Sequence, residues 1–269
     1  MPVSMLSVAG LAACALVAGC SQPNAPGGMR GVSLSFMTTP TSGAAGAAPG
    51  TAGFTIADGH HSLTVNQVQV VLARIELNGG SGSQCPRSDG ADERARDDRG
   101  GDCETLEVAP MLIDLPVDSA VVSELHVTVP AGTYSALEAT LSVPRDRDGV
   151  SSDFLSANPD FRNVSVRVAG TFDGQSFVYA GAPQAHLEFG FHPPLAVGDA
   201  GANITIHADL AEWFRDGAGA ILNPTTANAG GPNSALVADN IRRSLRAFRD
   251  DHRDGHDDDD GGDASHSLR

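Results

Sequence analysis

The chain has 269 residues, a formal net charge of −16 at pH 7 and only 5% aromatic residues, and it contains arginine but no lysine. Such an acidic surface repels nucleic acid and bare anionic lipid, because both favour dense positive charge, so nucleic-acid binding is excluded. A core of this composition has to come mainly from Val, Leu, Ile and Ala, and the length suits one large all-β domain or two small ones.

The chain begins with an apolar leader. Residues 5–19 (MLSVAGLAACALVAG) have the length and small side chains of the apolar core of a signal peptide, which we place at residues 1–19. This segment is shorter than the about 20 apolar residues that a membrane-spanning helix needs. Residues 1–4 carry no Lys or Arg, so we expect the natural start codon to lie upstream.

The leader stops at Leu16-Val17-Ala18-Gly19-Cys20. This run resembles the lipobox of bacterial lipoproteins, and the resemblance implies that Cys20 receives a lipid and becomes the mature N-terminus. The alternative is an ordinary signal peptide with Cys20 as a bystander. Residues 20–30 then form the lipidated cysteine and a flexible Pro/Gly/Asn-rich tether. The protein is therefore expected in the cell envelope, membrane-anchored on the periplasmic or outer-surface side.

The next segments predict strands. Residues 31–37 alternate apolar and polar side chains, and residues 38–53 form a low-complexity loop rich in Gly, Ala, Pro and Thr. Residues 62–77 (SLTVNQVQVVLARIEL) also fit a helical stripe, but the density of Val and Ile favours a strand with a bulge near Asn66.

Two of the four cysteines are expected to pair. Cys14 leaves with the signal peptide and Cys20 takes the lipid, so Cys85 and Cys103 remain. In an oxidising compartment they are expected to form a disulfide that closes a polar insert over residues 85–103. A metal site is the weaker interpretation, because the spacing and the lack of a nearby His do not suit one.

Clean strand alternation follows the insert. Leu125, Val127 and Val129 share one face, and Pro130-Ala131-Gly132 predicts a hairpin turn into a strand whose inner face begins at Thr133 and Ser135. The same alternation recurs at residues 164–168, 187–191 and 204–210. Short, half-buried strands with Gly/Pro turns predict an antiparallel β-sandwich over residues 31–215.

One amphipathic helix is expected near the C-terminus. Within residues 216–249, a linker leads to a segment that places Val237, Ile241, Leu245 and Phe248 on one helical stripe. The stripe is expected to pack on the sandwich, and a membrane-surface role for its arginines is the alternative. Residues 250–269 are expected to be a disordered acidic tail.

The motif Leu112-Ile113-Asp114-Leu115, followed by Val129-Pro130-Ala131-Gly132-Thr133-Tyr134, resembles a family of bacterial envelope lipoproteins. That family carries a prealbumin-like β-sandwich domain of unknown function, and the resemblance covers roughly residues 31–210. It implies a prealbumin-like fold but supplies no catalytic residues. The disulfide-closed insert and the acidic C-terminal extension are additions to the family pattern.

No common catalytic or nucleotide-binding motif is present. Glu124 and Glu138 are expected to lie nearly opposite each other on the outer face of the predicted hairpin, with His126 diagonal to Glu138. Paired carboxylates can perform acid–base chemistry or hold a cation. On an exposed strand face they are more commonly solvated, as we expect here and at His186 and His207.

Two acidic segments are candidate metal sites. The first resembles a fragment of a calcium loop and contains Asp146, Asp148 and Asp153, although a plain type I turn explains it better. The second lies in the tail and comprises Asp254, His256, Asp257, Asp258, Asp259 and Asp260. We expect no resident cofactor and at most weak binding of Ca²⁺ or another divalent cation, because flexible carboxylates lose chain entropy when they ligate an ion.

The sequence therefore predicts a non-enzymatic, lipid-anchored envelope protein whose sandwich binds a protein or glycan ligand or has a structural role. The contrasting hypothesis is a divalent-metal-handling lipoprotein that uses the Asp/His-rich tail. An extracytoplasmic hydrolase is a distant third, for want of a nucleophile and base.

The disulfide prediction is tested by non-reducing peptide mass spectrometry, which should detect a linked Cys85–Cys103 pair. The bridge closes a short polar loop, so its loss through the double Cys→Ala change should cost about 3 kcal/mol and leave the β-sheet circular dichroism unchanged. Free thiols at both positions would refute it.

Overall fold

The computed structural model describes residues 28–38, 53–79, 110–117, 121–145 and 150–258. Several predicted features lie outside these ranges: the signal peptide, the tether up to residue 27, residues 39–52 of the low-complexity loop and the insert at 85–103. All four cysteines and the candidate ligands Asp146, Asp148, Asp259 and Asp260 also lie outside them. The first strand contains Met29 and Arg30, assigned to the predicted tether, and Thr38, assigned to the predicted loop.

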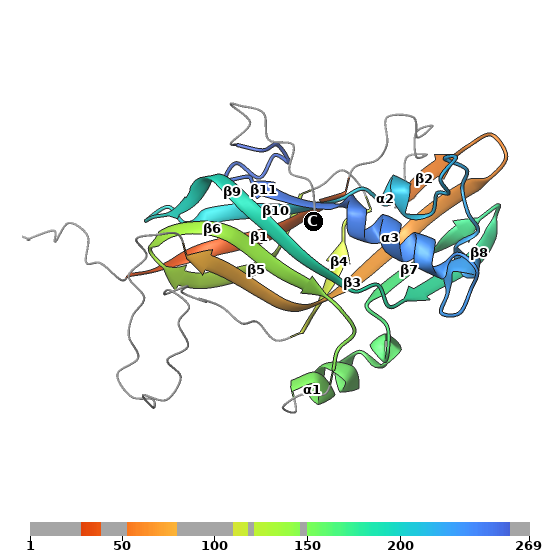
Figure 1. Cartoon of the computed structure of the whole chain (residues 1–269), viewed down its shortest axis with the longest axis horizontal. Helices are drawn as coiled ribbons and strands as arrows, with labels where there is room; N and C mark the ends of the chain where they lie inside the picture. Colours follow the sequence, from red (N-terminus) through yellow and green to blue (C-terminus); the bar gives the residue numbers. More distant parts are fainter. Residues whose placement is uncertain (1–27, 39–52, 80–109, 118–120, 146–149, 259–269) are drawn as a thin grey trace, which may run out of the picture.

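The longest strand, β3 (Ser62–Gly79), is the element around which the larger sheet forms. It pairs with four other strands, β2, β4, β6 and β7. This seven-stranded sheet consists of β2 (Phe54–Ala57), β3, β4 (Met111–Leu115), β6 (Gly132–Leu141), β7 (Val166–Phe172), β8 (Gln175–Gly181) and β9 (Ala185–Val197). Figure 1 shows β3 running obliquely through the molecule.

Two bulges adjust the direction in which the side chains of β3 point. The register with β7 shifts between Val65 and Gln67, so the bulge predicted near Asn66 is confirmed. A second shift lies between Leu72 and Arg74 in the pairing with β6. Each extra residue reverses the alternation, which keeps both Leu72 and Ile75 in the core although they are three positions apart.

The second sheet has four strands in the order β11-β10-β1-β5: β11 (Leu245–Arg249), β10 (Ala202–Ala208), β1 (Met29–Thr38) and β5 (Val122–Pro130). The two sheets agree with the predicted all-β sandwich, but the pair β1–β10 is parallel, so the prediction of antiparallel pairing is wrong here. Alternation identifies the buried face of a strand but not its direction.

The predicted hairpin at Pro130–Gly132 is also wrong. β5 pairs with β1 in the smaller sheet, whereas β6 pairs with β3 and β9 in the larger one, so this turn carries the chain between sheets. The hydroxyl of Tyr134 donates to the carbonyl oxygen of Pro130 at 2.7 Å and stabilises the corner. A register shift after Tyr134 leaves Thr133 and Ser135 exposed, contrary to the prediction that they face the core.

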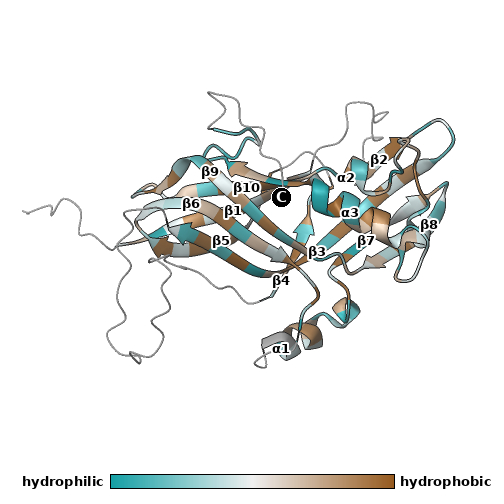
Figure 2. Cartoon of the chain, in the orientation of Figure 1, coloured by the Kyte–Doolittle hydropathy of each residue, from teal (hydrophilic) through white to brown (hydrophobic). Residues whose placement is uncertain are grey.

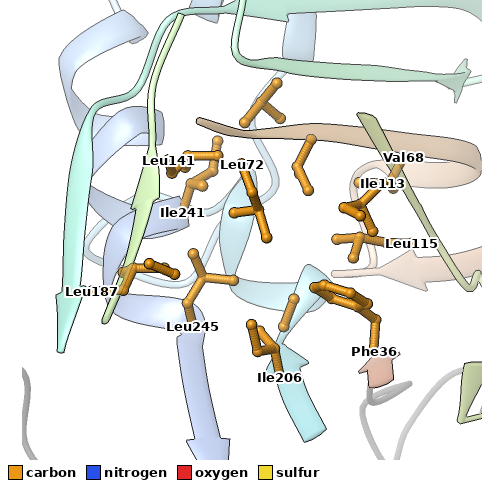
Figure 3. Close-up of a cluster of buried hydrophobic side chains, with 14 of the residues drawn as sticks. Phe36, Val68, Leu72, Ile113, Leu115, Leu141, Leu187, Ile206, Ile241 and Leu245 are labelled. Carbon is orange, nitrogen blue, oxygen red and sulfur yellow. The ribbon is translucent and has the colours of Figure 1, made fainter. Parts of the chain in front are cut away.

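The core lies between the two sheets, and brown apolar bands alternate with paler ones along the strands in Figure 2. Figure 3 shows the centre of this core, where side chains from both sheets and from the C-terminal helix meet. A cavity of about 20 Å³ remains there. Its lining is Phe36, Val70, Leu72, Leu115, Leu141, Leu187, Ile206, Trp213, Ile241 and Leu245. It could hold about one water molecule, so it has no room for an organic ligand.

The helices are short. They are α1 (Val150–Ala157), α2 (Leu210–Trp213) and α3 (Ser234–Ser244), with 3₁₀ turns η1 (Pro159–Phe161) and η2 (Pro224–Ala227). Val237 and Ile241 of α3 are buried. The predicted helical stripe is wrong from Leu245 onward, because Leu245 pairs with Ala208 and starts β11 instead. Within the described ranges, no helix combines the length and apolar character needed to cross a bilayer.

We predict that Ile241→Ala destabilises the protein by about 2–5 kcal/mol, because it enlarges a cavity among side chains that cannot collapse into it. Ile241 is fully buried and lines that cavity. The neighbouring Arg242→Ala is the control. It removes an exposed ion pair with Asp239 and an exposed hydrogen bond to the Ala238 carbonyl, and it should cost at most about 1 kcal/mol in the same denaturant titration. Equal losses in the two variants would contradict the packing of α3 described here.

Candidate functional site

Buried polar side chains lie on the outward face of the four-stranded sheet. Ser33 and Ser35 on β1 lie beside Asn203 and Thr205 on β10, and all four are at most 7% exposed. Their inward neighbours Leu34 and Ile204 belong to the core. A polar residue on the outward face normally meets water, so something has to cover these four. We call Ser33, Ser35, Asn203 and Thr205 the polar platform.

Residues 250–258, which follow β11 directly, fold onto the platform, and we call this segment the strap. It consists of hydrogen-bonded turns, so the prediction that residues 250–269 form a disordered tail is wrong for this part. The other tail residues, 259–269, lie outside the described ranges. Residues 250–258 therefore cover the outward face of the four-stranded sheet instead of extending into solvent.

Asp250 is the centre of the strap and is fully buried. One carboxylate oxygen accepts hydrogen bonds from the Thr205 hydroxyl at 2.8 Å and from the backbone N–H of Gly255 at 3.1 Å. The other oxygen accepts from the backbone N–H of Asp254 at 2.9 Å. A buried carboxylate is costly unless its lone pairs are satisfied, so these three donors are what make the burial tolerable.

The platform also binds the backbone of the strap. The side-chain amide of Asn203 donates to the carbonyl oxygen of Asp250 at 2.7 Å and accepts from the Ser35 hydroxyl at 2.8 Å. In the opposite direction, the N–H of Asp250 donates to the carbonyl oxygen of Asn203 at 3.0 Å. The N–H of Asn203 donates to the carboxylate of Asp251 at 2.9 Å. These bonds fix two consecutive aspartates in one position.

The far side of the strap crosses β1 toward β5. The guanidinium of Arg253 donates to the Ser33 hydroxyl at 2.9 Å, and this hydroxyl also lies 2.9 Å from Nδ1 of His126. A side chain at Gly255 would collide with Met37, and the φ of Gly255 is +80°, where residues with a Cβ are strained. Glycine is therefore favoured at this turn of the strap, because any other residue would be strained and would displace the Met37 side chain.

An ion pair joins the two ends of the strap. Nδ1 of His252 lies 2.6 Å from the carboxylate of Asp258, and the N–H of Asp258 donates to the carbonyl oxygen of Arg249 at 2.9 Å. The hydrogen bond from Asp258 and its charge raise the pKa of His252 above 6.5. Burial opposes ionisation of Asp258, but its hydrogen bonds with His252 and Asp251 outweigh burial and lower its pKa below 3.8.

Among the predicted metal ligands that the structure describes, Asp254 and His256 lie side by side, with Nδ1 of His256 3.6 Å from the Asp254 carboxylate, but no third ligand completes a site. Asp254 accepts from the backbone N–H of His256, Asp257 is half-buried and Asp258 is paired with His252. Asp153 lies exposed in α1. Among the described residues, no group of three or more His, Cys, Asp or Glu side chains is arranged to hold a metal ion.

The carboxylate pair predicted on the hairpin has different partners. Glu138 on β6 lies opposite Glu76 on β3 and Glu188 on β9 instead of Glu124 on β5, which belongs to the other sheet. Glu76 is buried and forms an ion pair with Arg74. Other side chains contact Glu138: Asn78 donates to one carboxylate oxygen, and Nε2 of His186 lies 3.4 Å from the other. This row of three glutamates was missed because its members come from three distant strands.

A third polar group joins loops at the end of the molecule where β2 meets β3. The Asp58 carboxylate accepts from the backbone N–H groups of Ile221, His61 and His60, and these bonds lower its pKa well below 3.8. The backbone N–H of Ser62, together with His61, lowers the pKa of Asp173. The Asp-Gly dipeptides at 58 and 173 signal turns, but the contact between them has no local signal.

The chain matches no family model, no curated protein and no solved structure.

We predict that the pKa of His252, followed by its ring-proton NMR signals, lies above 6.5 and falls toward that value in the Asp258→Asn variant. His252 gains a partner on folding, so its contribution to stability is complete below pH 6.5 and is lost as pH rises through its raised pKa. The contribution of Asp258 is present above pH 3.8 and is lost as pH falls through its lowered pKa. An unchanged His252 titration in the variant would show that the ends of the strap are not joined in solution.

Proposed function

We propose that this is a lipid-anchored cell-envelope protein whose sandwich is a non-enzymatic binding or structural module for a protein or glycan. The observation that carries the proposal is the position of the first strand relative to the lipobox-like cysteine. β1 begins at Met29, nine positions after Cys20. It starts at one end of the longest axis of the molecule, at the left in Figure 1.

This arrangement orients the domain on a membrane. The predicted tether between Cys20 and β1 has eight residues, 21–28, and a random coil of that length spans roughly 16 Å, so the end of the domain where β1 begins would stay near the lipid headgroups. The β2–β3 turn and the β7–β8 turn lie at the opposite end in Figure 1 and would face away from the membrane. The bonds of Asp58 and Asp173 hold these distal turns in one conformation, which reduces the entropy cost of binding a ligand there.

We also propose that the sandwich is prealbumin-like and that α3 is its packing helix. Two packed sheets support a prealbumin-like sandwich, while the parallel pair β1–β10 departs from a purely antiparallel arrangement. The burial of Val237 and Ile241 supports the role of α3 as the amphipathic helix that packs on the sandwich.

The anchor is tested by metabolic labelling with a palmitate analogue in a bacterial host. The wild-type protein should be labelled and fractionate with membranes. Cys20→Ala should lose the label and appear in the soluble fraction, because no acyl chain is then attached. Cys14→Ala is the matched control, since it removes a cysteine six positions earlier in the predicted signal peptide and should behave as wild type. Persistent labelling of Cys20→Ala would overturn the proposed anchor.

A further inference from the structure

We infer that the polar platform is a recognition face for an acidic peptide segment of a partner protein, and that the strap occupies this face as an intramolecular competitor. The inference deepens the proposed function as a binding module and rests on it, but it does not depend on the lipid anchor.

Charge complementarity is the first argument. Arg246 is the one formally charged side chain among the described outward residues of β1, β5, β10 and β11 around the strap, although the whole chain has a formal net charge of −16. These outward residues are His126, Ser33, Ser35, Met37, Asn203, Thr205, His207, Arg246 and Phe248. The strap that covers them contributes five aspartates among its nine residues. A face whose described charge is that of an arginine is suited to bind the negative charge of the strap.

The contacts specify a peptide. The Thr205 hydroxyl donates a hydrogen bond to the carboxylate of Asp250, and the backbone N–H of Asn203 donates one to the carboxylate of Asp251. Asn203 also exchanges hydrogen bonds with the backbone of Asp250, through its side-chain amide and its carbonyl oxygen. A free carboxylate or an acidic sugar could accept the hydrogen bonds from Thr205 and from the N–H of Asn203, but it has no peptide backbone to pair with Asn203. Consecutive acidic residues of a peptide supply both the carboxylates and the backbone groups that these hydrogen bonds need.

The strap can be displaced without unfolding the core. Asp250 is its only fully buried residue, and the other eight are exposed or half-buried. Its attachment is therefore mainly polar, and it competes efficiently because it is covalently linked to β11, which gives it a high effective concentration at the platform. A free peptide of similar sequence should bind only when the strap is weakened, and a partner with stronger acidic contacts should bind even against it.

The test uses the full chain carrying Cys20→Ala, in solution, with and without Asp250→Arg. The reversed charge places a cation against the Thr205 and backbone donors, so the strap should leave the platform. Asp160→Arg is the matched control, because it makes the same charge change at an exposed residue in η1. The probe is a fluorescein-labelled peptide with the sequence of residues 248–258, and its binding is followed by fluorescence polarisation.

We expect Asp250→Arg to bind the peptide at least ten-fold more tightly than the parent or Asp160→Arg. Replacing the first two aspartates of the peptide by Asn should abolish the gain, as should Thr205→Val added to the Asp250→Arg chain. Circular dichroism identifies any variant that fails to fold. If Asp250→Arg is itself unfolded, Asp250→Asn replaces it, with a smaller gain expected in the same direction.

Three results would overturn the inference. The first is no gain in binding when hydrogen exchange shows that the strap has lifted. The second is a strap that stays protected in the folded variants, which would show that Asp250 does not hold it. The third is equal affinity for the Asn-substituted peptide or for a polyuronate, which would show that the face does not recognise acidic peptide. The protein is not lipidated in this assay, so its outcome is separate from that of the anchor.

Discussion

Every backbone N–H and C=O group removed from water needs a partner, and in this protein the demand is greatest along β3. A strand of 18 residues is about 60 Å long, too long for one neighbour to satisfy. Four shorter strands share its edges, and two bulges keep its apolar side chains in the core as the strand bends. The rest of the larger sheet extends from these pairings, and the smaller sheet closes the core over it.

The alternation of side chains predicted the inward faces well, because burial of one face is a local property of a strand. Val166 and Val168, Leu187 and Phe189, and Ile204 and Ile206 are buried as the alternation predicted. Pairing was less predictable. Pro130–Gly132 has the composition of a hairpin turn, yet the same three residues can carry the chain between sheets, since both paths leave inward residues inward. The distant pairing of β1 with β10 has no local signal.

The position of the strap, like the strand pairing, could not be predicted from local sequence. Its composition is that of a solvated tail, with nine residues that include five aspartates and no large apolar side chain. Its order comes from Asn203 and Thr205, more than forty positions earlier, and from Ser33 near the N-terminus. Small polar residues alternating with Ile204 and Ile206 indicated an outward face, but only the tertiary structure shows that the face is covered. A buried Asp250 then accounts for the position of the strap.

The central claim is that Asp250 makes residues 250–258 a folded part of the domain. Amide hydrogen exchange of the full-length protein, resolved at single residues, tests it most directly. The N–H groups of Asp254 and Gly255 donate to the Asp250 carboxylate, so they should exchange well below the rate of an unstructured peptide. Exchange of both amides at the unstructured rate, while those of β10 stay protected, would contradict the account.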